Sequence, residues 1–354
     1  MKRYNVAVVG VGAVGIQMLR CLRTRNFPIK ELRVFARRNR DILVDGITYK
    51  VDSISPGGFE GIDIALFAGT EGDKGAAVTF APEAIKRGAV VIDNGADFRM
   101  KKDVPLVVPE INAKDITKNK GIIANPNCST IQMVLAIYPI YKKFGIKRII
   151  VTTFQAASGA GRGAVEQLFS ETKEVIEHFD SRFSILDSRL KLVSSIQYPV
   201  SRNLPQQLAF NVFPHIGGFQ EYNYTSEEWK MVHETRKILH DNKIKVSATC
   251  VRVPVRTGHS EAVYIETKKN VPAKTVKGIL SRTKGIKVVD NPDAGTYPLP
   301  LDCEGNDDVF VGRIRNDPFQ NNGLWLWVVS DNLIKGAALN AVQIAEFLIH
   351  KSKT

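Results

Sequence analysis

Cys128 has the sequence surroundings of a reactive thiol. It lies in Asn125-Pro126-Asn127-Cys128-Ser129-Thr130, and an apolar run at residues 131–140 continues as a helix pattern. We therefore expect Cys128 to be exposed on a loop at or near a helix N-terminus, where the helix dipole favours the thiolate. Cys21 and Cys250 lie inside an apolar helix pattern and a strand pattern, so both are interpreted as small buried hydrophobes.

A thiolate that attacks a carbonyl carbon needs a proton carrier, and histidine is the side chain most often used. Four of the six histidines fall on polar helix surfaces or helix ends, namely His178, His233, His240 and His350. His215, in Phe213-Pro214-His215-Ile216-Gly217, could be a buried structural residue, whereas His259 stands at a bend that begins a strand. Composition does not choose between these two.

A glycine-rich loop near the N-terminus indicates a dinucleotide site. Gly10-Val11-Gly12-Ala13-Val14-Gly15 follows an apolar strand pattern at 6–9 and opens a helix pattern at 13–23. Gly10 permits a tight turn, Gly12 lets the backbone approach a pyrophosphate, and Gly15 lets helix and strand pack closely. We expect the helix start, at Ala13 and Val14, to offer free N–H groups to the phosphates. The alternative is a glycine turn with a purely structural purpose.

Residues 35–40 bear on the choice between NAD and NADP. An NAD site usually has Asp or Glu about 20 residues after the glycines, where it binds the ribose hydroxyls. This chain has Phe35-Ala36-Arg37-Arg38-Asn39-Arg40 at that place. Because Arg37 and Arg38 suit a 2′-phosphate, we expect NADP as the cofactor. A solvated basic loop is the alternative interpretation.

The elements that must position these residues form two patterns. In the first third, short apolar strands at 6–9, 32–36, 62–68 and 90–93 alternate with helices at 13–23 and 76–87, the second interrupted or restarted at Pro82. This alternation predicts an α/β domain with a Rossmann-type, doubly wound parallel sheet. Later strands are longer and alternate, at 146–155, 246–255, 259–266, 307–315 and 324–330, with helices at 164–177 and 227–239. They predict an α+β domain with a mixed, largely antiparallel sheet.

A length of 354 residues favours two domains. We expect residues 1–127 to form the NADP-binding domain and 128–330 the catalytic domain, whose part in dimerisation is implied only by the family resemblance given below. A last helix at 334–349 could return to the first domain, so that 331–354 would join it, but the pattern alone does not decide this.

Composition excludes several classes of protein. No apolar run reaches the about 18–20 residues that span a bilayer, and the N-terminus leads straight into a strand pattern, so we expect a cytoplasmic protein with no membrane partner. The four cysteines show no CxxC or zinc-ligand spacing, so we expect neither disulfides nor a metal. The net charge of +13 is spread along the chain, which favours phosphorylated small ligands over nucleic acid.

The segment around Cys128 resembles the active-site segment of bacterial-type aspartate-semialdehyde dehydrogenases. The resemblance extends over nearly the whole chain, and its blocks in order are Asp93-Asn94, Phe98-Arg99, 108–112, 155–161, 210–217, 227–230, 250–255, 258–260 and 331–338. Each block is short, but their joint occurrence in order is specific.

The resemblance implies a role for each matching residue. Cys128 would be the nucleophile, Gln155 would position the substrate, and His259 rather than His215 would be the acid/base. The implied substrate contacts are Arg252 to the α-carboxylate, Glu227 to the amino group, and Arg99, Lys230 and Asn127 to the phosphate; Ser158, Gly159 and Asn332 would contact the cofactor. The alternative for Glu227 and Lys230 is an ordinary i,i+3 pair on a helix surface.

The implied reaction interconverts β-aspartyl phosphate with L-aspartate 4-semialdehyde and phosphate, in lysine, threonine and methionine biosynthesis. Cys128 would form a thioester, NADPH would deliver hydride, and His259 would protonate the oxyanion and take the proton back as the aldehyde forms. The family pairs through its second-domain sheet, which implies a homodimer, with a tetramer as the alternative.

Two loops depart from the family pattern. Residues 67–73 lack its serine- and glycine-rich turn, and residues 95–97 lack its usual serines, so the nicotinamide contacts of this chain are expected to differ. Two related reductases, for N-acetyl-glutamyl phosphate and for malonyl-CoA, are competing functions on the same scaffold. The first normally has Pro-Gly-Cys-Tyr-Pro at the cysteine, and the second would not need Glu227. A non-enzymatic dinucleotide-binding paralogue should have lost Cys128, Gln155, Arg252 or His259, and all four are present.

Overall fold

The first sheet of the computed structural model, which describes residues 2–69, 75–183 and 203–351, has seven strands in the order β3-β4-β2-β1-β5-β6-β7. Their bounds are β1 (Tyr4–Val9), β2 (Ile29–Ala36), β3 (Arg40–Val44), β4 (Ile47–Ser53), β5 (Ile64–Phe67), β6 (Val90–Asp93) and β7 (Ile122–Ala124). All neighbours are parallel except β3 and β4. Because side chains alternate along β1, Val6 and Val8 pack with α1 (Ala13–Thr24), and Ala7 and Val9 face the other way, into the core that contains α2 (Ala76–Lys86). Helices therefore cover both faces, and the doubly wound fold is confirmed.

The structure corrects two details of the predicted first domain. The sequence interpretation missed the β3–β4 hairpin, which turns at Asp45 and Gly46 with φ of 49° and 79°. An Asp-Gly pair is a strong hairpin signal because both positions need positive φ. Pro82 does not interrupt α2, which runs through it unbroken. The carbonyl that loses its helical donor belongs to Val78, which is 36% exposed and can be solvated.

The second sheet has six strands in the order β11-β12-β13-β10-β8-β9. Their bounds are β8 (Ile146–Gln155), β9 (Lys245–Arg252), β10 (His259–Thr267), β11 (Ile286–Val288), β12 (Val309–Asn316) and β13 (Gly323–Ser330). The central pairs are antiparallel and the two outer pairs are parallel, which confirms a mixed, largely antiparallel sheet. Helix α4 (Cys128–Phe144) buries its apolar side chains in the core that also holds Val263 and Leu326.

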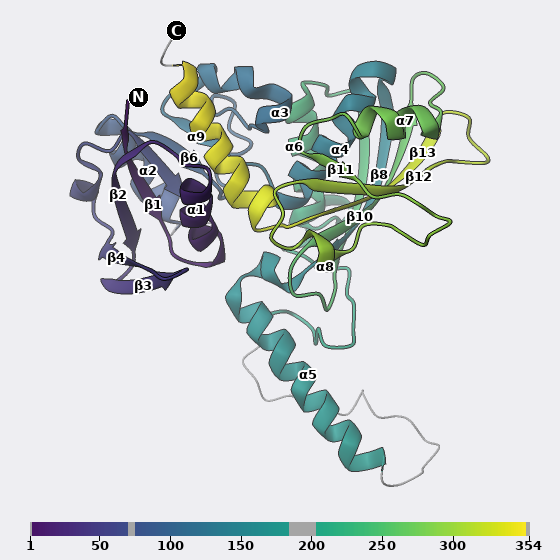
Figure 1. Cartoon of the computed structure of the whole chain (residues 1–354), viewed down its shortest axis with the longest axis horizontal. Coiled ribbons are helices and arrows are strands. Elements are labelled where there is room, and N and C mark those ends of the chain that lie inside the picture. The colour runs from purple at the N-terminus through teal and green to yellow at the C-terminus, as the bar shows by residue number, and fades with distance from the viewer. Residues whose placement is uncertain (1, 70–74, 184–202, 352–354) are drawn as a thin grey trace.

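The remaining helices connect and flank these sheets. The longer ones are α5 (Arg162–Phe183), which projects away from the sheets in Figure 1, α6 (Ser226–Leu239), α7 (Ala273–Leu280) and α9 (Leu339–Lys351). The short turns are α3 (Pro109–Asn112), α8 (Pro300–Cys303), η1 (Pro56–Phe59), η2 (Ala113–Lys118), η3 (Ala157–Ala160) and η4 (Glu221–Asn223). Among the described residues no helix is long and apolar enough to cross a membrane, and no cluster of potential metal ligands is found.

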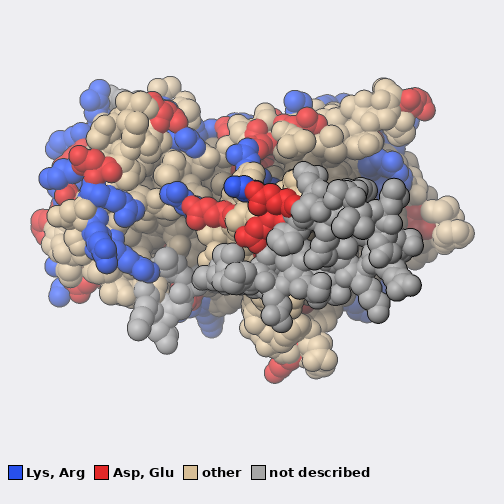
Figure 2. Space-filling view, turned by 90° about the horizontal axis from the view of Figure 1, so that it is seen from below, with Lys and Arg blue, Asp and Glu red and all other residues tan. Residues whose placement is uncertain are grey.

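The C-terminal helix returns to the first sheet. A π-helical turn, η5 (Ile334–Ala338), leads into α9, whose Leu339, Val342 and Ala345 pack in the same core as β1 and α1 (Figure 1). The π-helical turn contacts both α1 and α4. It therefore joins the helix after the glycine loop to the helix that begins at Cys128. On the face in Figure 2, basic side chains gather over the N-terminal domain at the left.

Candidate active site

A cavity of about 660 Å³ brings most of the predicted site residues together. Its lining includes Cys128, Gln155, Ser158, Gly159, Asn332, Arg99, Asn127, Glu227, Lys230 and Arg252. A second cavity of about 710 Å³ is lined by residues 9–15 and shares Val14, Ser158 and Gly159 with the first. The glycine loop and the cysteine therefore lie at one continuous hollow. Two predicted residues, Arg38 and His259, do not line either cavity.

Cys128 is the first residue of α4. Its neighbour Asn127 is the N-cap, and Asn127 Oδ1 accepts hydrogen bonds from the backbone N–H groups of Ser129 (3.0 Å) and Thr130 (3.2 Å). The π-helical turn lies directly against the cysteine, since a Cβ added at Gly336 would be 2.9 Å from Cys128 Cβ. The helix start and this turn together fix where the thiol lies.

The expectation of an exposed, dipole-stabilised thiolate is not met. Cys128 is only partly exposed, and burial raises the pKa of its thiol to about 12. The Glu227 carboxylate raises that pKa further, while Arg99, the Ser129 N–H and Arg252 oppose it. Desolvation therefore outweighs the nearby arginines and the Ser129 N–H, and favours the thiol form.

Glu227 is buried at the centre of several polar contacts and is not a surface residue. Its Oε1 accepts from Asn127 Nδ2 (2.8 Å) and Gln155 Nε2 (3.1 Å), and its Oε2 pairs with Lys230 Nζ at 3.4 Å. Burial alone would raise the pKa of Glu227, but Lys230 and the two amide hydrogen bonds outweigh it and lower the pKa. An ionised carboxylate therefore lies beside the cavity.

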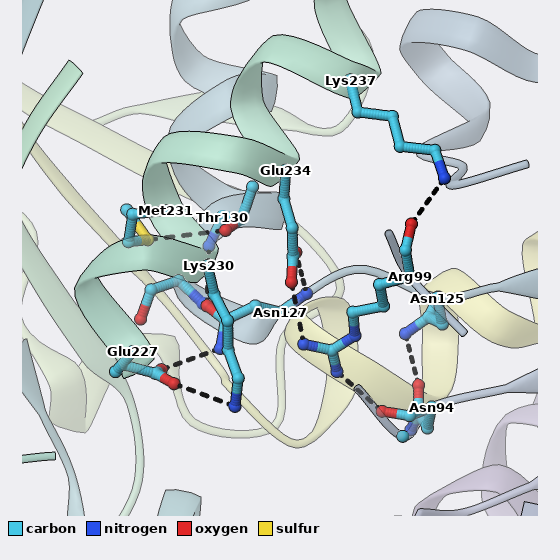
Figure 3. Close-up of polar contacts among 12 residues, drawn as sticks. Asn94, Arg99, Asn125, Asn127, Thr130, Glu227, Lys230, Met231, Glu234 and Lys237 are labelled. Carbon is cyan, nitrogen blue, oxygen red and sulfur yellow. Dashed lines mark hydrogen bonds and ion pairs between the residues drawn. The ribbon is translucent and has the colours of Figure 1, made fainter. Parts of the chain in front are cut away.

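Two arginines supply buried positive charge. Arg252, at the end of β9, is 4% exposed and donates from Nη1 to the carbonyl oxygen of Ala156 at 2.6 Å. Arg99 is 6% exposed and donates from Nη1 to Glu234 Oε1 (3.1 Å) and from Nη2 to the carbonyl oxygen of Asn94 (2.7 Å), as Figure 3 shows. Both guanidinium groups are therefore held by protein acceptors at the cavity wall.

His259 lies behind the cavity wall. It is fully buried, and a Cβ added at Gly159 would be 2.9 Å from its Cε1 and 3.0 Å from its Nε2. The Ala156 N–H donates to Nδ1 at 3.1 Å, which assigns the proton of the neutral ring to Nε2, an atom with no partner among the described residues. Burial and the nearby Arg252 lower the pKa of His259 to about 3. The ring is therefore a neutral donor.

His215 is the histidine that lines the cavity. It stacks on Phe219 with ring centroids 4.5 Å apart and is half-buried, so its interpretation as a buried structural residue is wrong. Residues 215–217 contribute to the cavity wall, and Ile216 also packs against the core.

The glycine loop has the shape that a pyrophosphate site requires. Gly10 has φ of +99°, and a Cβ at Gly15 would be 1.9 Å from the carbonyl oxygen of Gly10, whereas a Cβ at Gly12 would meet nothing within 4 Å. Arg37 lines the neighbouring hollow, and Arg38 does not. Two arginines that the sequence interpretation did not assign, Arg40 and Arg162, line it instead. Arg40 is the first residue of β3, so it was left unassigned because the β3–β4 hairpin was missed.

Of the remaining predicted cofactor residues, Ser158 and Gly159 line both cavities and Asn332 lines the first. Ser158 Oγ donates to Asn332 Oδ1 at 3.1 Å, and the Gly258 N–H donates to the same oxygen at 2.9 Å. Of the two departing loops, residues 70–73 lie outside the described part of the chain. In the other, at residues 95–97, Gly95 lines the cavity that holds Cys128.

The sequence interpretation also missed Glu234. Its spacing from Glu227, two helical turns along α6, places both carboxylates on one helix face, and this was the available signal.

Comparison with known proteins identifies the family. The model "Semialdehyde dehydrogenase, NAD binding domain" matches residues 5–119, and "Semialdehyde dehydrogenase, dimerisation domain" matches 137–335. The chain is 49% identical to the aspartate-semialdehyde dehydrogenase of Aquifex aeolicus, with 98% of each chain covered, and 47% identical to that of Bacillus subtilis, with 97% of each covered.

Solved structures agree with this match. The structure of aspartate semialdehyde dehydrogenase II from Vibrio cholerae complexed with ASA has a TM-score of 0.89 and 42% identity, with 99% of each chain covered. The Candida albicans enzyme with NADP has a TM-score of 0.70 and 26% identity, with 99% of each covered. These findings favour aspartate semialdehyde over the acyl-glutamyl, malonyl-CoA and non-enzymatic alternatives. The chain therefore belongs to the aspartate-semialdehyde dehydrogenase family and is an NAD(P)-dependent oxidoreductase of amino-acid biosynthesis.

Proposed function

We propose that this dehydrogenase interconverts β-aspartyl phosphate and L-aspartate 4-semialdehyde through a thioester on Cys128, with NADP as its cofactor. The observation that carries the proposal is the single cavity that joins a half-buried thiol to an ionised carboxylate and two buried arginines. A thioester suits the reaction because it accepts hydride far more readily than a carboxylate does. The Vibrio cholerae relative solved with ASA supports the substrate.

The charges of the cavity suit an amino acid that carries a phosphate. We assign the α-carboxylate to Arg252, whose planar guanidinium can bind both carboxylate oxygens. We assign the amino group to the ionised Glu227, and the phosphate to Arg99, Lys230 and Asn127. Gln155 donates to Glu227 at 3.1 Å, so its amide lies where it can orient the substrate beside Cys128.

His259 is the proposed acid/base. Its Nε2–H can donate to the oxyanion that forms on the substrate carbon, because Nδ1 is already an acceptor for Ala156. The thiol of Cys128 must lose its proton as it attacks, and Nε2 can take that proton only if the ring proton moves to Nδ1, which gives up the contact with Ala156. The imidazolium formed in this way then protonates the oxyanion from Nε2 and takes the proton back as the hemithioacetal collapses.

The second cavity fits NADP. The loop at residues 10–15 would hold the pyrophosphate, with Ala13 and Val14 at the helix start, and Ser158, Gly159 and Asn332 would lie towards the nicotinamide. Arg37 and Arg40 line the hollow, so we assign the 2′-phosphate to them rather than to Arg38. When bound, NADP supplies the hydride exchange. The Candida albicans relative solved with NADP supports this choice over NAD.

We further propose a homodimer formed through the second-domain sheet, supported by the dimerisation-domain match at residues 137–335. The proposed division is 1–127 with 331–354 for the cofactor domain, and 128–330 for the catalytic domain. We place the protein in the cytoplasm, because its four cysteines are free and unpaired thiols are typical of that reducing compartment.

A coupled set of assays tests the function. Purified protein is given L-aspartate semialdehyde with NADP⁺, with and without phosphate, and NAD⁺ and N-acetyl-glutamate semialdehyde are run alongside. We expect phosphate-dependent reduction of NADP⁺ with L-aspartate semialdehyde, and much weaker turnover with the other two. Equal turnover with NAD⁺ would contradict the cofactor assignment, and turnover of the acetylated substrate would contradict the role of Glu227.

A further inference from the structure

Glu234 connects two parts of the site that come from distant parts of the sequence. It is 1% exposed; its Oε2 accepts from the backbone N–H of Asn127 at 2.7 Å, and its Oε1 accepts from Arg99 Nη1 at 3.1 Å (Figure 3). Asn127 precedes the cysteine, and Arg99 follows β6. One buried carboxylate therefore fixes the distance between the helix N-cap beside Cys128 and a guanidinium in the cavity wall.

We infer that Glu234 is a positioning residue of the phosphate site, which acts by holding Arg99 and the Asn127 backbone in place. The inference rests on the proposed assignment of phosphate to Arg99 and Asn127. Glu234 does not line the cavity itself, so it acts through these two residues.

Helix α6, which carries Glu234, also holds the backbone of Arg99 through Lys237. Lys237, one turn after Glu234 on α6, donates from Nζ to the carbonyl oxygens of Arg99 (2.6 Å), Lys101 (2.9 Å) and Val104 (2.8 Å). The side chain and the backbone of Arg99 are thus both attached to α6, as Figure 3 shows for both contacts. An arginine that is ordered before phosphate arrives loses less side-chain freedom on binding, and this raises affinity.

A charge-only role makes the opposite prediction. Burial raises the pKa of Glu234, while Arg99, the Asn127 N–H and Lys230 oppose the rise. If Glu234 served only to neutralise Arg99, removing its charge would strengthen phosphate binding. If Glu234 positions Arg99, the same change weakens phosphate binding. Arg99 and the Asn127 N–H both donate to Glu234, whereas a glutamine there has only one accepting oxygen, and its NH2 group is itself a donor.

The chain offers a matched control on the same helix. Glu228 is also a buried carboxylate that joins two backbone donors, the N–H groups of Thr225 (2.7 Å) and Cys250 (3.1 Å). None of these three residues lines the cavity. Glu228→Gln should therefore cost stability in the way that Glu234→Gln does, without affecting phosphate.

The experiment measures the Tm and the KM values for phosphate and for L-aspartate semialdehyde in wild type, Glu234→Gln, Glu234→Asp and Glu228→Gln. We expect both Glu234 variants to raise the phosphate KM about tenfold or more, because each variant loses one charge-assisted hydrogen bond. The aldehyde KM should stay within about twofold, and Glu228→Gln should lower Tm alone. Glu234→Asp keeps the negative charge on a side chain that is shorter by one methylene group. If Glu234→Gln does not fold, the phosphate KM of Glu234→Asp tests the positioning role.

If the wild type depends on phosphate and the phosphate KM of the Glu234 variants is unchanged or lowered, the inference about Glu234 is overturned and the proposed function is not. A parallel rise in both KM values would also overturn it, because that result indicates general loss of structure. Wild-type turnover that does not depend on phosphate would overturn the proposed function, and this inference with it.

Discussion

The backbone N–H of Ala156 donates to Nδ1 of His259 at 3.1 Å, and this contact sets what the histidine can do. With Nδ1 occupied as an acceptor, the ring proton lies on Nε2, on the side of Gly159. The thiol of Cys128 and the imidazole of His259 are both neutral in the resting structure, since burial raises the pKa of one to about 12 and lowers that of the other to about 3. This pair is not a preformed thiolate and imidazolium.

Alkylation of Cys128 tests this resting state. In the free protein, the rate of labelling by iodoacetamide should rise about tenfold per pH unit between about pH 6 and about pH 9, because only the thiolate reacts. Labelling is followed on the Cys128 peptide by mass spectrometry, with Cys128→Ser as the control. A plateau near neutral pH would show that a thiolate is already present and would contradict the neutral pair.

Two glycines of the cofactor loop should respond differently to alanine. Gly12→Ala adds a methyl group that meets no protein atom, so we expect an unchanged Tm and a raised KM for NADP⁺. Gly15→Ala places a methyl group 1.9 Å from the Gly10 carbonyl oxygen, so we expect a loss of about 2 kcal/mol or more in stability. Thermal unfolding and cofactor titration measure both. A normal KM for NADP⁺ in Gly12→Ala would mean that the cofactor does not approach this loop.

Glu261 should make stability fall as pH rises. It is fully buried on β10, and burial raises its pKa well above 4.5, although a contact with the Gln132 side chain opposes the rise. Between the two pKa values of Glu261, the folded protein keeps a proton that the unfolded chain releases. The free energy of unfolding is therefore highest below the pKa of Glu261 in the unfolded chain, and it falls as pH rises towards the pKa of Glu261 in the folded protein. Glu261→Gln keeps the shape and removes this dependence.

Urea unfolding of wild type and Glu261→Gln measures the effect. At about pH 8 the variant should be more stable by about 1 kcal/mol or more, and the difference should shrink towards about pH 5. A difference that stays constant across this range would show that Glu261 titrates normally.

Much of the architecture could be predicted from local pattern. Buried parallel strands such as β6 are continuous apolar runs, and the bounds of β6 agree with the predicted 90–93. The apolar run at 131–140 indicates α4 but leaves out the turns at its two ends. The hairpin at Asp45 and Gly46 was missed because its strands are largely exposed and lack an apolar run. Pro82 was over-interpreted because the sequence does not reveal that the carbonyl four residues earlier faces solvent.

The site was predicted less completely than the fold. Residue types and the family resemblance named the side chains that line the cavity, but contacts between distant segments determine their ionisation. The thiol pKa depends on burial, the tautomer of His259 depends on Ala156, and the role of Glu234 depends on Arg99. None of these relationships leaves a local pattern in the sequence.

The central claim is the thioester on Cys128, and trapping it is the most direct test. Enzyme, L-aspartate semialdehyde and NADP⁺ are mixed without phosphate, quenched in acid and analysed by intact mass and peptide mapping. We predict one aspartyl adduct on the Cys128 peptide, lost when phosphate is added before the quench and absent in Cys128→Ser. Formation of NADPH without an adduct on Cys128, or turnover by Cys128→Ser, would contradict the account.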